Sequence, residues 1–335
     1  MASLIRPVIQ VDTEKCVNCH RCISVCPAKM CNDGSKNYVS IIHELCIGCG
    51  KCIEACSHGA RSGIDDFNQF LSDRKNGVKM VAVISPAAAV SFKGRDLELN
   101  AWLKSIGVEA FFDASFGAEL ATKSYAEYMK KKNPKLVVSQ SCPSLVTFCE
   151  IYRPNLLPYL SPVDSPIVCT IKMIKKFYPQ YKDYKVVIVS PCYSERREMD
   201  ETECGDYNIT FKSIDAYFKE KQINLNSLDK VLYMNPPAER GVSFSTPGGF
   251  IVTAERYIPG ITAKSRKIAG LPIVAEYLVH LEKSLAKTSE PIFKLVDCLA
   301  CVRGCNGGAG TVADKLSLDE MESYVEKRKE DRQKH

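Results

Sequence analysis

The sequence of 335 residues lacks a long hydrophobic run and contains few histidines. Its longest uncharged apolar stretch, residues 81–92, is too short to cross a bilayer, and residues 1–10 lack the apolar core of a signal peptide. Basic clusters such as 130–132 have neither interleaved aromatic residues nor a nucleic-acid-binding motif. The five histidines show no paired metal-ligand spacing. We therefore expect a cytoplasmic protein that inserts into no membrane and binds no nucleic acid.

Cysteine is what the sequence has in excess. The chain contains 17 cysteines, with 45% hydrophobic and 25% charged residues and a formal net charge of +6. A length of this order suggests about two domains. A disulfide framework is typical of small secreted chains, whereas this chain is long, lacks a signal peptide and groups its cysteines at metal-ligand spacings. The composition therefore favours a globular protein that binds metals or iron–sulfur clusters.

The spacing C-x2-C-x2-C-x3-C occurs twice within residues 16–56. Two residues between thiolates let one tight loop reach three corners of a cubane, while the cysteine after the longer gap reaches the other cluster. The repeat predicts two [4Fe-4S] clusters whose ligands are exchanged between the repeats. The first set is Cys16, Cys19, Cys22 and Cys56, and the second set is Cys46, Cys49, Cys52 and Cys26.

Structural zinc is the alternative for this segment, but tetrahedral zinc sites pair two C-x2-C units and have no use for a third cysteine two residues on. The segment resembles the bacterial dicluster ferredoxins, except that Ser57 stands where the first repeat has Pro27. We therefore expect residues 1–68 to form an α+β ferredoxin-like domain that relays electrons. His20 and His58, beside the cluster ligands, are expected at the surface or behind the ligands.

Residues 69–335 show strands that alternate with helices. Residues 80–85, 136–139 and 186–190 are continuous apolar runs, as expected of strands buried on both faces of a mostly parallel sheet. Residues 97–106 predict a helix that ends at Gly107, and Ser317 with Glu320 predicts a capping box at the start of a last helix. The pattern indicates an α/β domain.

Each of the three predicted strands runs into a turn that contains proline: Ser85-Pro86, Cys142-Pro143 and Pro191-Cys192. In α/β sheets, ligands bind at the carboxyl ends of strands, where these turns collect. Cys142 also precedes a predicted helix, whose positive end is expected to lower the pKa of the thiol. The turns therefore predict a site that contains Cys142 and Cys192.

A further motif, Cys301-Val-Arg-Gly-Cys305, precedes a glycine-rich segment. With the turns at Cys142 and Cys192, it resembles the active domain of the iron-only (di-iron) hydrogenases across residues 80–311. The resemblance implies mostly parallel sheets with a cluster between two lobes, and a third [4Fe-4S] cluster. Its implied ligands are Cys142, Cys192, Cys301 and Cys305, the last of which would bridge to a di-iron subsite carrying carbon monoxide and cyanide; Pro86, Ala87, Gly307 and Gly308 would surround it.

The sequence departs from that family at two positions beside the implied cluster. Ser141 stands where efficient members have a proton-donating cysteine, and Glu195 stands where a lysine donates to a cyanide ligand. An ionised carboxylate only accepts hydrogen bonds and would repel cyanide, unless Arg196 or Arg197 takes the place of the lysine. Cys298 and Ser141 are the residues that we consider as a proton relay. Tyr125 and Tyr128 fall where the family has proton-channel glutamates.

The resemblance implies interconversion of H2 with protons and electrons, and these departures resemble the sensory subgroups, in which turnover is slow. Such a protein would need di-iron maturation proteins and a redox partner such as a ferredoxin or a signalling protein. The alternative, which Glu195 supports, is a non-catalytic hydrogenase-like protein of electron transfer or iron–sulfur assembly, without the di-iron subsite. A plain ferredoxin-type carrier would leave Cys142, Cys192, Cys301 and Cys305 unexplained.

Overall fold

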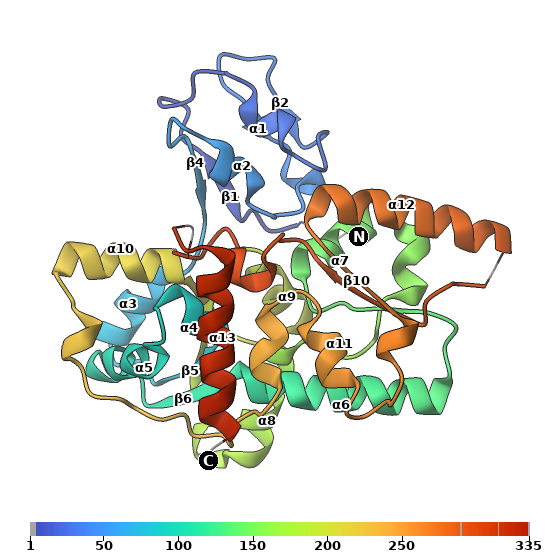
Figure 1. Cartoon of the computed structure of the whole chain (residues 1–335). Coiled ribbons are helices and arrows are strands. Elements are labelled where there is room, and N and C mark those ends of the chain that lie inside the picture. Colours follow the sequence, from blue (N-terminus) through green and yellow to red (C-terminus); the bar gives the residue numbers. More distant parts are fainter. Residues whose placement is uncertain (1–4, 289, 314, 334–335) are drawn as a thin grey trace.

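Residues 5–63 form a small lobe that stands on the rest of the chain in the computed structural model, which describes residues 5–288, 290–313 and 315–333 (Figure 1). In this lobe β1 pairs with β4 and β2 pairs with β3, both antiparallel. The elements are β1 (Ile9–Val11), α1 (Arg21–Ser24), β2 (Asn32–Asp33), β3 (Ser40–Ile41), η1 (His43–Leu45), α2 (Lys51–Ala55) and β4 (Arg61–Gly63). Such short elements bury few large apolar side chains of their own, and Ile9 and Ile47 pack in a core cluster that is shared with the larger lobe.

A four-stranded parallel sheet forms one half of the larger lobe, in the order β6-β5-β8-β9. Its strands are β5 (Met80–Ile84), β6 (Ala110–Asp113), β8 (Lys185–Ser190) and β9 (Tyr207–Thr210). All five residues of β5 are fully buried, because helices cover both faces of the sheet. The strands predicted at 80–85 and 186–190 are confirmed.

A second parallel sheet, in the order β10-β11-β7, forms the other half. It consists of β7 (Val137–Val138), β10 (Ser265–Ala269) and β11 (Leu295–Leu299). β7 is shorter than the predicted strand at 136–139, because only two of its residues pair with β11 in the strand register. The observed fold is therefore the predicted one: a ferredoxin-like lobe followed by an α/β domain with parallel sheets.

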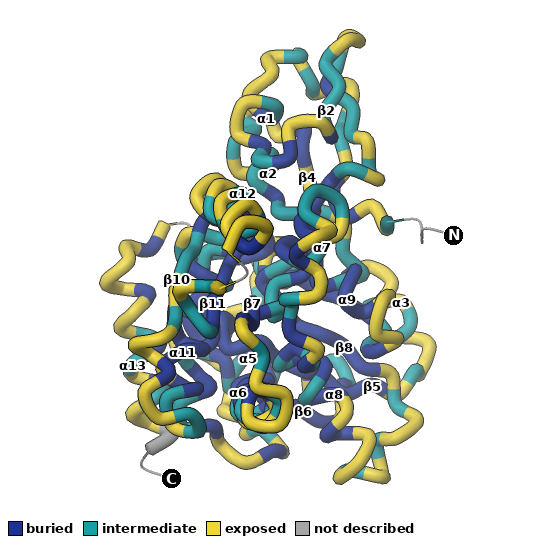
Figure 2. Tube along the Cα trace, turned by 90° about the vertical axis from the view of Figure 1, so that its right-hand side faces the viewer, coloured by how far each residue is buried: buried dark blue, intermediate teal, exposed yellow. Residues whose placement is uncertain are grey.

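Helices surround both sheets, and Figure 2 shows their exposed outer faces against the buried strands. The Gly107 N–H donates to the Lys104 carbonyl at the end of α5, and Ser317 and Glu320 form the capping box of α13, both as predicted. The helices are α3 (Phe67–Lys75), α4 (Ala88–Ser91), α5 (Asp96–Ser105), α6 (Ala114–Lys132), α7 (Pro143–Tyr152), α8 (Pro166–Phe177), α9 (Glu195–Thr202), α10 (Phe211–Lys221), α11 (Gly249–Ala254), α12 (Leu271–Thr288) and α13 (Leu318–Gln333). Within the described residues, none of these helices has the length and apolar character needed to cross a membrane.

The two lobes meet where the strands of both parallel sheets end (Figure 1). The predicted boundary after residue 68 lies inside α3, whose Phe67 and Phe70 are buried in the core of the larger lobe. Across the contact, the Tyr152 hydroxyl donates to the Leu45 carbonyl at 2.6 Å. The Arg197 guanidinium donates to the Cys46 carbonyl at 2.7 Å. The small lobe is therefore held directly above the strand ends.

Candidate metal centres

The first predicted set of four cysteines lines one cavity of the small lobe. Cys56 joins Cys16, Cys19 and Cys22 there, although α2 separates it from them in the sequence. Backbone and side-chain donors point at the sulfurs: the Val39 N–H donates to Cys16 Sγ at 3.4 Å, and Arg61 Nη2 donates to Cys22 Sγ at 3.4 Å. The structure thus brings the predicted set together, and their role as iron ligands stays a prediction.

The second predicted set lines a separate cavity, which also contains a thiol that the sequence analysis did not assign. The residues shared with the prediction are Cys26, Cys46, Cys49 and Cys52, and the added one is Cys31. Cys31 Sγ lies 3.5 Å from Cys26 Sγ, and this contact lowers the pKa of Cys26 to about 7. The same neighbour lowers the pKa of Cys46 to about 6. Thiolates, the form that binds iron, are favoured at these two positions.

A buried arginine forms part of the wall of both cavities. Arg61 is 4% exposed and lines each of them. Its Nη2 donates to the Val39 carbonyl at 2.9 Å, whereas its Nη1 has no hydrogen-bond partner among the described residues. A buried cation with a free donor suits an anionic ligand on either side. The donor sets and this charge therefore fit two [4Fe-4S] clusters.

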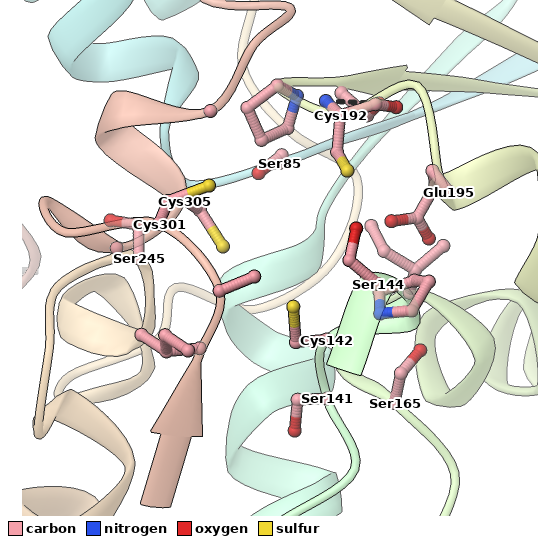
Figure 3. A pocket seen from close by; sticks show the side chains of 18 of the residues that line it. Ser85, Ser141, Cys142, Ser144, Ser165, Cys192, Glu195, Ser245, Cys301 and Cys305 are labelled. Carbon is pink, nitrogen blue, oxygen red and sulfur yellow. Dashed lines mark hydrogen bonds between the residues drawn. The ribbon is translucent and has the colours of Figure 1, made fainter. Parts of the chain in front are cut away.

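The larger lobe contains a buried pocket of about 90 Å³ at the strand ends, between the two sheets. Cys142 is the N-cap of α7, Cys192 follows β8, and Cys301 precedes the 3-10 turn η7 (Gly304–Gly307), which contains Cys305. In Figure 3 the four sulfur atoms point into a common space. Three distant segments therefore place the predicted ligands of the third cluster around one pocket.

Burial governs the chemistry of these four thiols. It raises the pKa of Cys192 to about 12, and it raises the pKa of Cys142 in spite of backbone N–H donors at the start of α7. The sequence prediction that the helix end would lower the pKa of Cys142 is therefore wrong, because desolvation outweighs the helix donors. Buried thiolates need a cationic centre between them, so this donor set fits an iron cluster.

The structure places only two of the four residues that were predicted to surround the third cluster at the pocket. Pro86 and Gly308 line the pocket. Ala87 does not line it and is fully buried in the core beneath β5, and Gly307 faces the side chain of Arg303 instead. Gly308 lies so close to the Pro191 carbonyl that a Cβ atom would come within 2.5 Å of it. The glycine is therefore required by packing against the Cys192 turn.

Three carboxyl groups share the pocket with the four thiols. Glu195 and Glu198 come from α9, and Asp297 comes from β11. Ser165 donates to Glu198 at 2.8 Å and Ser139 donates to Asp297 at 3.3 Å, while Glu195 Oε1 and Asp297 Oδ2 have no partner among the described residues. No lysine, arginine or histidine belongs to the described lining of the pocket. The acidic residues in the described lining therefore have no basic counterpart, although apolar residues and serines make up most of the wall.

Burial raises the pKa of all three carboxyl groups. It raises the pKa of Glu195 and, together with the charge of Glu195, the pKa of Glu198. It raises the pKa of Asp297 to about 6. The two glutamates share a hydrogen bond, which requires that one of them is protonated. The pair therefore favours a shared proton over two full negative charges.

Neither arginine beside Glu195 replaces the family's lysine. Arg196 Nη1 pairs with Asp66 at 2.9 Å, and Arg197 Nη1 donates to the Cys46 carbonyl of the small lobe. Neither side chain lines the pocket. The suggested substitution by an arginine is therefore wrong, because Arg196 is held by Asp66 and the Asp206 carbonyl, and Arg197 is held by the small lobe.

The two residues considered for a proton relay lie in different places. Ser141 lines the pocket, but its hydroxyl points away from the sulfurs in Figure 3 and interacts with Tyr125, whose pKa burial raises to about 12. Cys298 does not line the pocket. It is fully buried on the opposite face of β11, because side chains alternate along a strand and Asp297 and Leu299 face inward. The assignment of Cys298 beside the cluster is therefore corrected.

The second small-lobe cavity and the pocket share a wall. Gly48 and Cys49 line both of them. Ser194, which follows the Cys192 turn, donates to the Gly48 carbonyl at 2.8 Å, and Ser144 lies 2.8 Å from the same hydroxyl. A short, hydrogen-bonded connection therefore joins the small-lobe site to the pocket.

Two comparisons with protein families cover most of the chain. Residues 78–309 match the model of the iron only hydrogenase large subunit, C-terminal domain, and residues 15–61 match the 4Fe-4S dicluster domain. The dicluster match supports two [4Fe-4S] clusters in the small lobe. Within the described residues, no three His, Cys, Asp or Glu side chains are grouped to hold a single metal ion.

Two curated relatives that match this chain are named as iron–sulfur cluster assembly factors and not as hydrogenases. The "Cytosolic Fe-S cluster assembly factor NAR1" of Yarrowia lipolytica is 26% identical over 47% of this chain and 36% of its own length. The protein of that name from Encephalitozoon cuniculi is 24% identical over 63% of this chain and 62% of its own length. The chain thus spans less than two thirds of either relative.

Solved structures agree on the fold. A variant of the [FeFe]-hydrogenase HydA1 from Chlamydomonas reinhardtii superposes with a TM-score of 0.62 and 18% identity, over 78% of this chain and 88% of that one. A second [FeFe]-hydrogenase structure, described for oxygen inactivation of the H cluster, gives a TM-score of 0.63 at 18% identity, with the same coverage. At this identity the likeness concerns the fold alone.

Proposed function

The chain belongs to the iron-only hydrogenase family, and from that premise we propose that it is a non-catalytic, hydrogenase-like iron–sulfur protein that transfers electrons through three cubanes. The small lobe would hold two of them, and Cys142, Cys192, Cys301 and Cys305 would hold the third. The di-iron subsite would be absent. Iron–sulfur assembly, the work named for the NAR1 relatives, is the process in which we place it.

One observation carries this proposal: the pocket is lined by carboxyl groups and has no basic side chain in its described lining. A cyanide-bearing di-iron subsite is anionic and needs hydrogen-bond donors beside its cyanides. Glu195 stands at that position, with Glu198 behind it. An ionised carboxylate there would repel the cyanide, and a protonated one would offer a single O–H in place of the three N–H donors of a lysine.

The four thiolates and the cubane would supply one-electron chemistry, and the surrounding residues define how electrons reach it. Gly48 and Cys49 separate the pocket from the second small-lobe cavity, so electrons pass between these two sites. The apolar lining, which includes Phe244, Phe250 and Leu299, excludes water. Tyr125 behind Ser141 is too weak an acid to supply protons rapidly, since burial raises its pKa to about 12.

Hydrogen conversion is the second candidate, and the family match over residues 78–309 favours it. The sensory role, the di-iron maturation proteins and a redox partner such as a ferredoxin or a signalling protein belong to this candidate. Both candidates share the third cubane and its four cysteines. They differ in whether the protein reacts with H2.

The test is a redox titration followed by electron paramagnetic resonance, with an assay for H2 uptake and evolution, on protein made anaerobically with the di-iron maturation proteins. We expect three one-electron centres and no hydrogen conversion. Cys305→Ala should remove one centre and leave the other two. Hydrogen conversion by the wild type that Cys305→Ala abolishes would overturn the proposal in favour of the second candidate.

A further inference from the structure

The second cavity of the small lobe contains one thiol more than a cubane needs. Cys31 is 3% exposed and lines the cavity together with the four predicted ligands. Its Sγ lies 3.5 Å from Cys26 Sγ, and its thiol also interacts with Cys46. The described lining of the first cavity contains only its own four cysteines. The two otherwise equivalent sites therefore differ by one sulfur.

The structure holds Cys31 against the second site. The Cys31 carbonyl accepts a hydrogen bond from the Ile42 N–H at 2.8 Å, which fixes the backbone beside β3. The Asn32 side-chain amide donates to Cys31 Sγ at 3.4 Å, so the sulfur is oriented as an acceptor. Arg61, with an unpartnered Nη1, lies in the wall of the same cavity and marks it as a site for an anion. Cys31 is thus a buried sulfur at an anion site.

The distance between the two sulfurs is within the range of a side-chain rotation. Staggered rotamers lie about 120° apart, and such a rotation about χ1 moves a cysteine sulfur by about 3 Å. The Sγ atoms of Cys26 and Cys31 are 3.5 Å apart. Cys31 can therefore approach the iron corner that Cys26 binds without a rearrangement of the chain.

We propose that Cys31 is a reserve ligand of the second cubane, which binds the iron in place of Cys26 when Cys26 is released or absent. In the exchange, the iron–sulfur bond to Cys26 breaks and the bond to Cys31 forms. The proton on Cys31 Sγ moves to Cys26 Sγ, and no electron is transferred. The proposal concerns the small lobe, so it holds with or without hydrogen conversion in the larger one.

The two repeats supply a matched experiment, because Cys26 and Cys56 occupy the same position in each. The full chain is reconstituted anaerobically, and its iron and sulfide contents and the resonance signals of the reduced clusters are measured. We expect Cys26→Ala to keep the iron content of the wild type and Cys56→Ala to lose the iron of one cubane. Cys31→Ala should keep full iron, whereas the double variant Cys26→Ala/Cys31→Ala should lose one cubane. Equal losses in Cys26→Ala and Cys56→Ala would overturn the proposal.

A second variant covers the case in which Cys26→Ala does not fold. In Cys26→Ser, either the serine oxygen or the Cys31 sulfur binds the iron. If Cys31 is the ligand, adding Cys31→Ala to this variant changes the resonance signal of the second cubane. If the signal stays the same, serine is the ligand and the proposal fails.

Discussion

The small lobe and the pocket of the larger lobe offer the same four-thiol donor set in opposite electrostatic surroundings. Arg61 lies in the wall of both small-lobe cavities, and Lys51 also lines the second one. The pocket instead contains Glu195, Glu198 and Asp297. Since cubane reduction adds an electron, cationic walls raise the reduction potential and carboxylates lower it. The difference indicates that the third cubane holds electrons less tightly than the small-lobe clusters.

The largest effect is expected from removal of a pocket thiol. Cys301→Ala leaves three thiols in the pocket and touches no ligand of the small lobe. We expect loss of one third of the iron and of one resonance signal, because an incomplete thiolate set does not retain a cubane. The control is Cys169→Ala, which removes a thiol that lines none of these three cavities. Loss of a small-lobe signal in Cys301→Ala would break the comparison, because the sites would then not be separate.

The next largest effect is expected from a change at the contact between the two lobes. A Cβ at Gly50 would clash with the Ala309 side chain, whereas one at Gly59 meets nothing within 4 Å, and both glycines have positive φ, +75° and +63°. Gly50→Ala should therefore lower the free energy of unfolding by about 2–5 kcal/mol, the sum of backbone strain and overpacking. Gly59→Ala should cost only the strain, about 1–2 kcal/mol. Denaturant unfolding of the two variants measures these costs, and the rate of electron transfer between the lobes shows whether their contact is disturbed. An equal loss of unfolding free energy in Gly50→Ala and Gly59→Ala would contradict the account.

The charge of the pocket can be tested by comparing the reduction potentials of the clusters in the wild type and in a variant without the glutamate pair. The double variant Glu195→Gln/Glu198→Gln removes both ionisable groups of the pair beside the third cubane, and one full charge at 4–8 Å in an effective dielectric of about 20 amounts to about 2–4 kcal/mol. The potential of that cubane should therefore rise by on the order of 100 mV for one electron. The small-lobe potentials should stay the same.

Two controls accompany this variant. Glu201→Gln, on the same helix but exposed, should leave all three potentials close to those of the wild type. Arg61→Gln should lower the potentials of both small-lobe clusters, since Arg61 lines both cavities. A redox titration that finds no shift in the double variant would show that the glutamate pair is uncharged.

The smallest effect is expected from Asp297 and depends on pH. Burial raises the pKa of Asp297 from 3.8 to about 6, so between these values the folded state holds a proton that the unfolded state has released. The protein therefore loses stability as the pH rises to about 6, and the penalty is full above it. Asp297→Asn removes this penalty and should stabilise the protein by up to about 3 kcal/mol at pH 8, and by about half as much at pH 5.

Denaturant unfolding at both pH values measures this gain. Asp183→Asn, at an exposed position, is the control and should show no dependence on pH. A gain that is equal at pH 5 and pH 8 would mean that the Asp297 carboxyl keeps its usual pKa.

Spacing along the chain was enough to predict the two donor sets of the small lobe, whereas the set of the third cluster came from the resemblance to the hydrogenase family. The exchange of Cys26 and Cys56 between the two small-lobe cavities follows from the three-residue gap in each repeat, and the structure brings both sets together. The parallel strands follow from continuous apolar runs. These features are local in the sequence, so they can be derived from it.

The acidic wall was missed because it depends on burial. Glu198 stands three residues after Glu195 on α9, which is the spacing of one helix face, but nothing local indicates that this face turns inward. Asp297 could have been found from strand alternation, since it shares a face of β11 with Leu299, whereas Cys298 has the other face. The role of Cys31 depends on the folding of the loop after Cys26, and no spacing rule predicts it.

The most direct test of the central claim is infrared spectroscopy of the wild-type protein produced anaerobically together with the di-iron maturation proteins. The acidic pocket predicts the iron and sulfide content of three cubanes and no bands from metal-bound carbon monoxide or cyanide. Bands of metal-bound carbon monoxide and cyanide that shift under H2 would contradict the account and show that the pocket accepts a di-iron subsite beside Glu195.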